Sequence, residues 1–384
     1  MKVGVLGAGT MGAGIAQVAA QAEHEVVLVD VNADAVEKAK SSLIKLSQKQ
    51  IEKGKWTEDY SNQLISRIQY STNMQDFSGV GIVIEAIVEN VEVKHKVFSQ
   101  LESIVGNDCI LASNTSSIPI AEIGSVLKNP TRMIGIHFFN PAPLMPLVEI
   151  IPAVQTNETI KNTAKALIDS WGKITVLAKD TPGFIVNRVA RSFYGEALRI
   201  YEEGIADFAT IDWAMTHFGG FRMGPFTLMD YIGNDVNYAV TESVYHAFYN
   251  EPRFKPSFTQ KRHAQAGYLG RKSGRGYYDY SEGVEMPQPN QDEQLGKEIF
   301  NRILVMLINE AADTLFWGIA SKEDIDLAMM KGVNYPKGLL QWGDEIGLDH
   351  VLQRLENLFE EYGEDRYRPS PMLKRMVKEG KKFF

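Results

Sequence analysis

Short apolar runs alternate with amphipathic helical segments in the first half of the chain. Residues 2–6 form an apolar run that ends in glycines, and residues 12–22 carry apolar side chains at helical spacing. Residues 25–30 are a second apolar run, which ends in an acid. A buried strand, a helix and a second buried strand in this order predict one βαβ unit.

The same alternation continues for another 150 residues or so. Helical segments such as 91–105 separate further strand-like runs, which lie at 67–71, 80–87, 109–112, 132–137, 147–151 and 173–176. Residues 33–65 are an unusually long, polar and lysine-rich helical stretch, interrupted near Gly54. Strands and helices that alternate in this way predict an α/β fold with a doubly wound, Rossmann-type sheet.

From Pro182 onward the pattern changes to long helices without strands, and this half contains an internal repeat. Residues 286–291, rich in Pro, Gln and Asn, have the composition of a linker. The repeat has a constant offset (301 − 187 = 114), which relates Asn187-Arg188 to Asn301-Arg302, Glu196-Ala197 to Glu310-Ala311, Gly204-Ile205 to Gly318-Ile319, Asp212 to Asp326 and Gly233 to Gly347. We therefore predict three domains: a Rossmann domain over 1–182 and two all-α copies over 183–281 and 292–384.

Composition narrows the classes of partner and environment. The chain has 384 residues, of which 44% are apolar and 23% charged, as in ordinary globular proteins. A formal net charge of −8 argues against nucleic acid as a partner. No apolar run approaches the roughly 18 residues of a membrane span, and glycines interrupt the N-terminal run where a signal peptide would continue. Cys109, the single cysteine, lies in a strand-like run and is expected to be buried and inert. We expect a cytoplasmic protein without a metal site.

The three glycines of the first turn follow the spacing of a dinucleotide-binding loop. Gly7 suits a tight turn, Gly9 a close approach of backbone to a pyrophosphate, and Gly12 the packing of helix on strand. Asp30 follows Gly12 by 18 residues, where an acid accepts hydrogen bonds from the adenine ribose and repels a 2′-phosphate. The pattern therefore predicts NAD rather than NADP. Asp30 could instead cap the following helix.

An imidazole and a carboxylate stand late in the predicted sheet. His137 ends the apolar run that begins at Met133, and Glu149 lies inside the apolar run 146–151, where an unpaired charge would be costly. A His–Glu pair would remove that cost and fix the imidazole tautomer for acid–base chemistry. The alternative is that Glu149 pairs with an arginine and that His137 is a core residue.

Five motifs in this order resemble the L-3-hydroxyacyl-CoA dehydrogenase family, particularly its 3-hydroxybutyryl-CoA dehydrogenase members. They are Gly7–Gly12, Glu85–Asn90, Ser113–Ser117, His137–Pro141 and Pro182–Arg188. The resemblance runs from residue 1 to about residue 281. The segment after the linker is similar to the extra helical copy of longer relatives and of multifunctional β-oxidation proteins.

The resemblance implies a role for individual residues. His137 matches the catalytic base, Glu149 its orienting carboxylate, and Ser116 and Asn187 the residues that contact the substrate. The positions that match NAD contacts are Gly7, Ala8, Gly9, Thr10, Met11, Gly12, Asp30, Ala86, Glu89, Lys94, Ser116, Asn140 and Lys272. Two alternatives remain: Ser116 could cap a helix that begins at Ile120, and Lys94 could be a solvated helix-face charge.

A CoA-binding face is expected on the polar helix of residues 33–65. Ser42, Lys45 and Lys49 share one helix face, and Ser42 and Lys49 resemble the family's contacts to the CoA moiety. A lysine-bearing helix can also serve solubility alone.

The resemblance implies NAD-dependent, reversible oxidation of an (S)-3-hydroxyacyl-CoA, of short chain such as 3-hydroxybutyryl-CoA, to the 3-oxoacyl-CoA. Two alternatives stay open: a dehydrogenase of a non-CoA hydroxy acid or sugar acid of the gulonate type, and a non-enzymatic dinucleotide sensor. The duplicated helical copies could pack on each other and replace a dimer contact. The chain would then be a monomer with an internal pseudo-dimer, or a homodimer through another surface.

Overall fold

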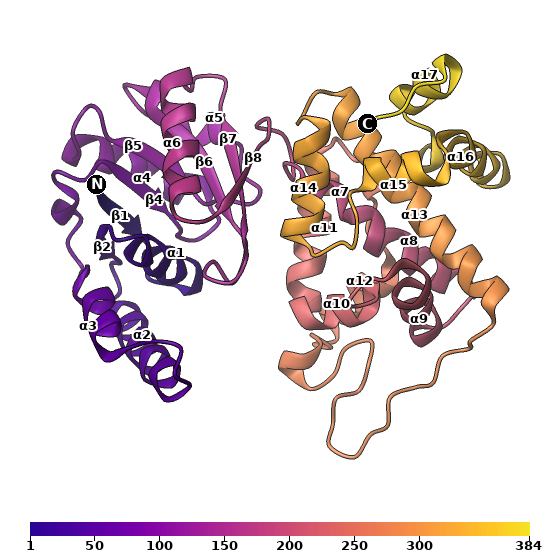
Figure 1. The fold of residues 1–384 in the computed structure, drawn as a ribbon, viewed down its shortest axis with the longest axis horizontal. Helices are drawn as coiled ribbons and strands as arrows, with labels where there is room; N and C mark the ends of the chain where they lie inside the picture. Colours follow the sequence, from indigo (N-terminus) through magenta and orange to yellow (C-terminus); the bar gives the residue numbers. More distant parts are fainter. The chain divides into compact units, whose positions relative to one another are not determined.

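The computed structural model describes all 384 residues and contains two compact units, residues 1–184 and 185–384 (Figure 1). The first unit is the α/β part of the chain and the second is entirely helical. Both predicted helical copies belong to the second unit, so the finer division at residues 281 and 292 remains a prediction.

The first unit is built on one eight-stranded sheet with the order β3-β2-β1-β4-β5-β6-β7-β8. All neighbouring strands are parallel except β6 and β7, which are antiparallel. The order reverses between β1 and β4, so the predicted doubly wound sheet is confirmed. The strands are β1 (Lys2–Leu6), β2 (Glu25–Val29), β3 (Ile68–Ser71), β4 (Ile82–Glu85), β5 (Ile110–Ser113), β6 (Met133–Phe138), β7 (Leu147–Pro152) and β8 (Ile174–Leu177).

The helices of this unit are α1 (Thr10–Gln21), α2 (Ala33–Glu52), α3 (Glu58–Ser66), α4 (Val91–Ile104), α5 (Ile120–Gly124) and α6 (Glu158–Ser170). The long polar stretch predicted over 33–65 is the pair α2 and α3, and Gly54 lies in the break between them with φ +65°. The Asn32 side chain caps α2 by accepting from the backbone N–H groups of Asp34 and Ala35.

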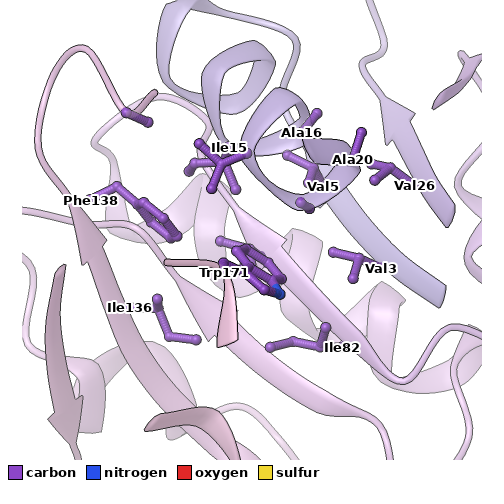
Figure 2. Close-up of a cluster of buried hydrophobic side chains, with 14 of the residues drawn as sticks. Val3, Val5, Ile15, Ala16, Ala20, Val26, Ile82, Ile136, Phe138 and Trp171 are labelled. Carbon is purple, nitrogen blue, oxygen red and sulfur yellow. The ribbon is translucent and has the colours of Figure 1, made fainter. Parts of the chain in front are cut away.

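One core joins α1 to the sheet beneath it. Ile15 and Ala16 of α1 lie over Val5 and Ile82, and Trp171, just after α6, completes the cluster (Figure 2). Each of these side chains is nearly or fully buried. A buried aliphatic or aromatic side chain of this size contributes about 1.5–3 kcal/mol, so this cluster fixes the first helix on the first strand.

The second unit consists of helices in two successive sets. The first set is α7 (Val186–Val189), α8 (Arg191–Glu202), α9 (Phe208–Gly219), α10 (Pro225–Ile232), α11 (Asn234–Ala247) and α12 (Phe258–Gln265). The second set is α13 (Glu293–Phe316), α14 (Lys322–Gly332), α15 (Leu339–Ile346), α16 (Leu348–Tyr362) and α17 (Pro371–Glu379). The predicted linker over 286–291 contains neither helix nor strand. None of the helices combines the length and apolar character of a membrane span.

Equivalent residues of the repeat make equivalent hydrogen bonds. Asp212 accepts from the backbone N–H groups of Phe226 and Thr227, and Asp326 accepts from those of Leu340 and Gln341, 114 residues further on in each case (340 − 226 = 114). Gly233 and Gly347 both precede a helix, with φ of +106° and +93°. The sequence repeat is therefore a repeat of local structure.

Candidate active site

The site lies where the carboxyl ends of the parallel strands meet. The glycine turn follows β1, Asp30 follows β2, the segment 86–90 follows β4 and the segment 114–117 follows β5. His137 is the penultimate residue of β6. Ligands of doubly wound sheets bind at this edge, beside the point where the strand order reverses.

The glycine turn has the geometry of a phosphate-binding loop. Gly7 adopts φ +106° and its N–H donates to the Val29 carbonyl at 2.7 Å. A Cβ on Gly12 would lie 1.8 Å from the Gly7 carbonyl oxygen, whereas a Cβ on Gly9 would meet nothing within 4 Å. Gly12 therefore serves helix packing, and Gly9 faces open space through which a ligand can approach the backbone.

The N-terminus of α1 has donors to offer to such a ligand. Gly9 is its N-cap residue, and no side chain accepts a hydrogen bond from the first turn. Free N–H groups and the positive end of the helix dipole make this a binding site for phosphate groups. The residues present therefore fit the pyrophosphate of a dinucleotide.

Asp30 lies beside this turn and is half-buried. Its carboxylate accepts from the N–H of Ala8 at 2.7 Å and from the N–H of Asn32 at 2.9 Å. The alternative that Asp30 caps the next helix is wrong, because Asn32 caps α2. Asp30 thus links the glycine turn to the end of β2, where a ribose hydroxyl would bind.

His137 and Glu149 form the predicted pair. They are opposite residues in the antiparallel ladder of β6 and β7, and His137 Nδ1 lies 2.7 Å from Glu149 Oε2. Glu149 is completely buried and His137 is 6% exposed. The alternative that His137 is a core residue not paired with Glu149 is therefore wrong. Because a carboxylate accepts, Nδ1 carries the proton, and Nε2 is left as a base.

Two aromatic rings border the imidazole. The ring of Phe139 lies 4.6 Å and that of Phe184 lies 5.8 Å from the His137 ring, centroid to centroid. The N–H of Phe138 donates to Asn114 Oδ1 at 2.8 Å, which ties the end of β6 to the loop after β5. Asn114 belongs to the recognised Ser113–Ser117 motif, but the sequence did not single it out.

A single carboxylate organises the loop that carries Ser116. Glu89 Oε1 accepts from Thr115 Oγ1 at 2.6 Å, from Ser116 N at 3.0 Å and from Ser117 N at 3.1 Å. The helix-capping alternative for Ser116 is wrong, because Pro119 is the N-cap residue of α5 and Asp180 accepts from its first N–H groups. The Ser116 hydroxyl has no hydrogen bond within the protein, and it remains available to a ligand.

Lys94 and Glu85 form a buried ion pair beside this loop. Lys94 is 1% exposed, and its Nζ lies 2.6 Å from Glu85 Oε1. The alternative that Lys94 is a solvated helix-face charge is therefore wrong. Sequence reasoning missed Glu85, although an acid that ends the apolar run Ile82–Ile84 poses the same burial problem as Glu149.

The remaining predicted residues fall into three groups. Ala86 N donates to the Leu6 carbonyl at 2.7 Å, and Asn140 precedes a cis proline, so both lie in the loops at the sheet edge. Ser42 and Lys49 are exposed on α2, as is Lys45. Asn187 and Lys272 belong to the helical unit, where Lys272 Nζ pairs with Asp235 at 2.6 Å.

Comparison with known proteins matches both units. Residues 2–181 match the family model "3-hydroxyacyl-CoA dehydrogenase, NAD binding domain". Residues 183–280 and 299–382 each match "3-hydroxyacyl-CoA dehydrogenase, C-terminal domain", which places one match on either side of the linker.

Individual relatives are similar over most of their length. A 3-hydroxyadipyl-CoA dehydrogenase of Escherichia coli is 37% identical, over 97% of this chain and 96% of its own. A probable 3-hydroxybutyryl-CoA dehydrogenase of Deinococcus radiodurans is 42% identical over 73% of this chain and all of its own. The crystal structure of 3-hydroxybutyryl-CoA dehydrogenase from Escherichia coli superposes with a TM-score of 0.92 at 36% identity, covering 99% of each chain.

Proposed function

Because the chain belongs to the 3-hydroxyacyl-CoA dehydrogenase family, we propose that it oxidises a short-chain (S)-3-hydroxyacyl-CoA with His137 as the base. The chain is an NAD-dependent 3-hydroxyacyl-CoA dehydrogenase. The preference for a short acyl chain rests on the relatives, whose names specify 3-hydroxybutyryl-CoA and 3-hydroxyadipyl-CoA.

The His137–Glu149 pair is the observation that carries the mechanism. His137 Nε2 removes the proton from the 3-hydroxyl group while the hydrogen on C3 leaves as hydride. NAD, when bound, accepts that hydride. The imidazolium formed on His137 is stabilised by Glu149, whose carboxylate lies 2.7 Å from Nδ1. In the reverse direction the imidazolium returns the proton to the oxygen of the 3-oxo group.

Ser116 and Asn187 are proposed to bind the substrate oxygen. A hydroxyl or amide donor stabilises the negative charge that develops on this oxygen as its proton leaves. For Ser116 the support is its unpaired hydroxyl on a loop held by Glu89. Asn187 and the cofactor contact Lys272 rest on the family resemblance alone, as do the CoA contacts Ser42 and Lys49.

Substitution of the base tests this assignment. We expect His137→Gln to lower kcat by about 10²–10⁴-fold, because general base catalysis contributes about that much. The Kd for NADH, followed by fluorescence titration, should stay within about twofold. His350→Gln, an exposed histidine of the helical unit, is the matched control and should keep full activity. If His137→Gln kept most of its activity, His137 would not be the base.

The substrate class is tested by offering thioesters and free acids to the same enzyme. Acetoacetyl-CoA with NADH should be reduced rapidly, and free hydroxy acids or sugar acids with NAD should react far more slowly. The reverse preference would favour the gulonate-type alternative. Rates for C4 to C16 thioesters then measure the chain-length preference.

We also propose that the two helical copies form an internal pseudo-dimer. Arg188 of the first copy pairs with Glu310 of the second at 2.6 Å, and Arg302 of the second pairs with Glu196 of the first at 2.6 Å. The repeat relates Arg188 to Arg302 and Glu196 to Glu310, so the two ion pairs are reciprocal, as in a twofold-symmetric interface. Light scattering should report a monomer, or a dimer that is joined through a different surface. A dimer joined through the first helical copy would contradict the proposal.

We further propose a cytoplasmic location, which is compatible with the single buried thiol.

A further inference from the structure

Three charged side chains beside the Ser116 loop do not neutralise one another. Lys94 Nζ lies 2.6 Å from Glu85 Oε1 and 3.4 Å from Glu89 Oε2. Neither carboxylate forms an ion pair with any other cation, and Lys94 forms none with any other acid. Two carboxylates that share one ammonium leave a net charge of one negative unit.

The hydrogen bonds around both carboxylates fit their ionised forms. The oxygens of Glu85 accept from Lys94, from the N–H of Ile87 at 2.7 Å and from Ser113 Oγ at 2.6 Å. Burial raises the pKa of Glu89, but Lys94 and the donors of the loop outweigh burial and hold this pKa below its usual value. The contacts around the group therefore fit one net negative charge.

The sheet topology indicates which half of the cofactor would lie beside this charge. Asp30 and the glycine turn, at the ends of β2 and β1, suit the adenosine half and the pyrophosphate. The nicotinamide half must then lie across the switch point, over the ends of β4, β5 and β6, since the hydride acceptor has to approach a substrate held at His137. Glu89 and the Ser116 loop occupy those strand ends.

We propose that Glu85, Lys94 and Glu89 form a group whose net negative charge lies beside the nicotinamide. Compared with an uncharged site, this group lowers the Kd of NAD⁺ relative to the Kd of NADH. The nicotinamide ring is positively charged in NAD⁺ and neutral in NADH, so a nearby negative charge attracts the oxidised form alone. Glu89 is the member of the group with an exposed side chain (38%), so a ligand can contact the group at Glu89. This inference rests on the proposed placement of the nicotinamide near His137.

The test compares the Kd values of NAD⁺ and NADH, measured by calorimetry without any acyl-CoA. In Glu89→Gln the Kd of NAD⁺ should rise at least about tenfold more than that of NADH, for a charge within about 12 Å at an effective dielectric constant of about 20. Glu85→Gln removes the same charge from the other side of Lys94 and should shift the ratio in the same direction. This second variant keeps the test decisive if Glu89→Gln fails to fold.

Two controls separate charge from loop structure. Glu89→Asp keeps the charge but shortens the side chain, so it should leave the ratio of the two Kd values within about twofold even if both rise. Glu92→Gln neutralises an exposed acid of α4, the helix that carries Lys94, and should leave the ratio unchanged. Equal weakening of NAD⁺ and NADH in Glu89→Gln would overturn the inference and leave Glu89 a purely structural role. Because no substrate is present, this result does not depend on whether His137 is the base or whether the substrate is a thioester; it depends on the placement of the nicotinamide alone.

Discussion

Glu310 Oε1 accepts a hydrogen bond from Arg188 Nε at 2.6 Å, although 122 residues separate the two along the chain. The other oxygen of Glu310 accepts from Arg253 at 2.9 Å, and Glu310 is completely buried. Glu310 therefore contacts two buried guanidinium groups of the first helical copy, and Asp313 supplies a second carboxylate beside Arg253. Removal of one partner from a buried ion pair lowers the free energy of unfolding by far more than the intact pair contributes to it, because the other charge stays buried.

Glu310→Gln should consequently destabilise the helical unit by about 3–5 kcal/mol. Asp313 lies 2.8 Å from Arg253 but 3.8 Å from Arg188, so Arg188 would lose the carboxylate closest to it, because an amide oxygen carries no charge. Urea unfolding followed by circular dichroism measures the change. Lys297→Gln breaks an exposed pair with Glu293 and should change stability by less than about 0.5 kcal/mol. Equal effects of the two substitutions would contradict this account of the interface.

The glycines of the first turn should separate stability from cofactor binding. A methyl group on Gly9 meets nothing within 4 Å, so Gly9→Ala should fold with a Tm within about 2 °C of the wild type. The same methyl group occupies the path to the helix N–H groups, and the Kd for NADH should rise by at least about tenfold. Gly12→Ala places its Cβ 1.8 Å from the Gly7 carbonyl oxygen and should lower the Tm strongly. An unchanged Kd in Gly9→Ala would exclude this turn from cofactor binding.

Cys109 should be unreactive in the folded protein. Burial raises the pKa of its thiol from 9.0 to about 11. The folded state thus holds the proton more tightly than the unfolded state does. The resulting contribution to stability is complete below about pH 9 and is lost as the pH rises through about 11. Iodoacetamide at pH 8.5 should leave the native protein unmodified by mass spectrometry and should modify it fully in urea. Rapid alkylation of the native protein would show that the thiol is accessible.

The order of elements could be predicted from the sequence because strand and helix periods are local properties. The strands β1 to β8 and the break near Gly54 lie within two or three residues of the predicted positions. The antiparallel direction of β7 relative to β6 was not predicted. Strand direction depends on the conformation of the connection over residues 139–146, and the spacing of apolar residues does not indicate it.

Two features of the structure depend on contacts that the sequence does not reveal. The repeat was visible because equivalent residues keep a constant offset, but the cross-pairing of Arg188 with Glu310 is a property of packing between the copies. Lys94 has the sequence context of a surface lysine on a helix, and its burial is explained by the ion pairs with Glu85 and Glu89. An acid inside or at the end of an apolar run indicates a buried partner, and this reasoning led to Glu149 but was not applied to Glu85.

Glu149→Gln should separate the orienting function of this side chain from its charge. The amide oxygen of glutamine can still accept from His137 Nδ1, so the imidazole keeps its tautomer, but the imidazolium loses its charged partner. A hydrogen bond to a charged group is worth about 1.5–3 kcal/mol, which corresponds to a loss in kcat of roughly 10–150-fold. Stopped-flow measurement of acetoacetyl-CoA reduction gives kcat, and the Kd for NADH should not change. The effects should not be additive, since Glu149 acts through His137. The variant with both His137→Gln and Glu149→Gln should be about as slow as His137→Gln alone, and a further loss of the full single-variant size would show that Glu149 has a separate function.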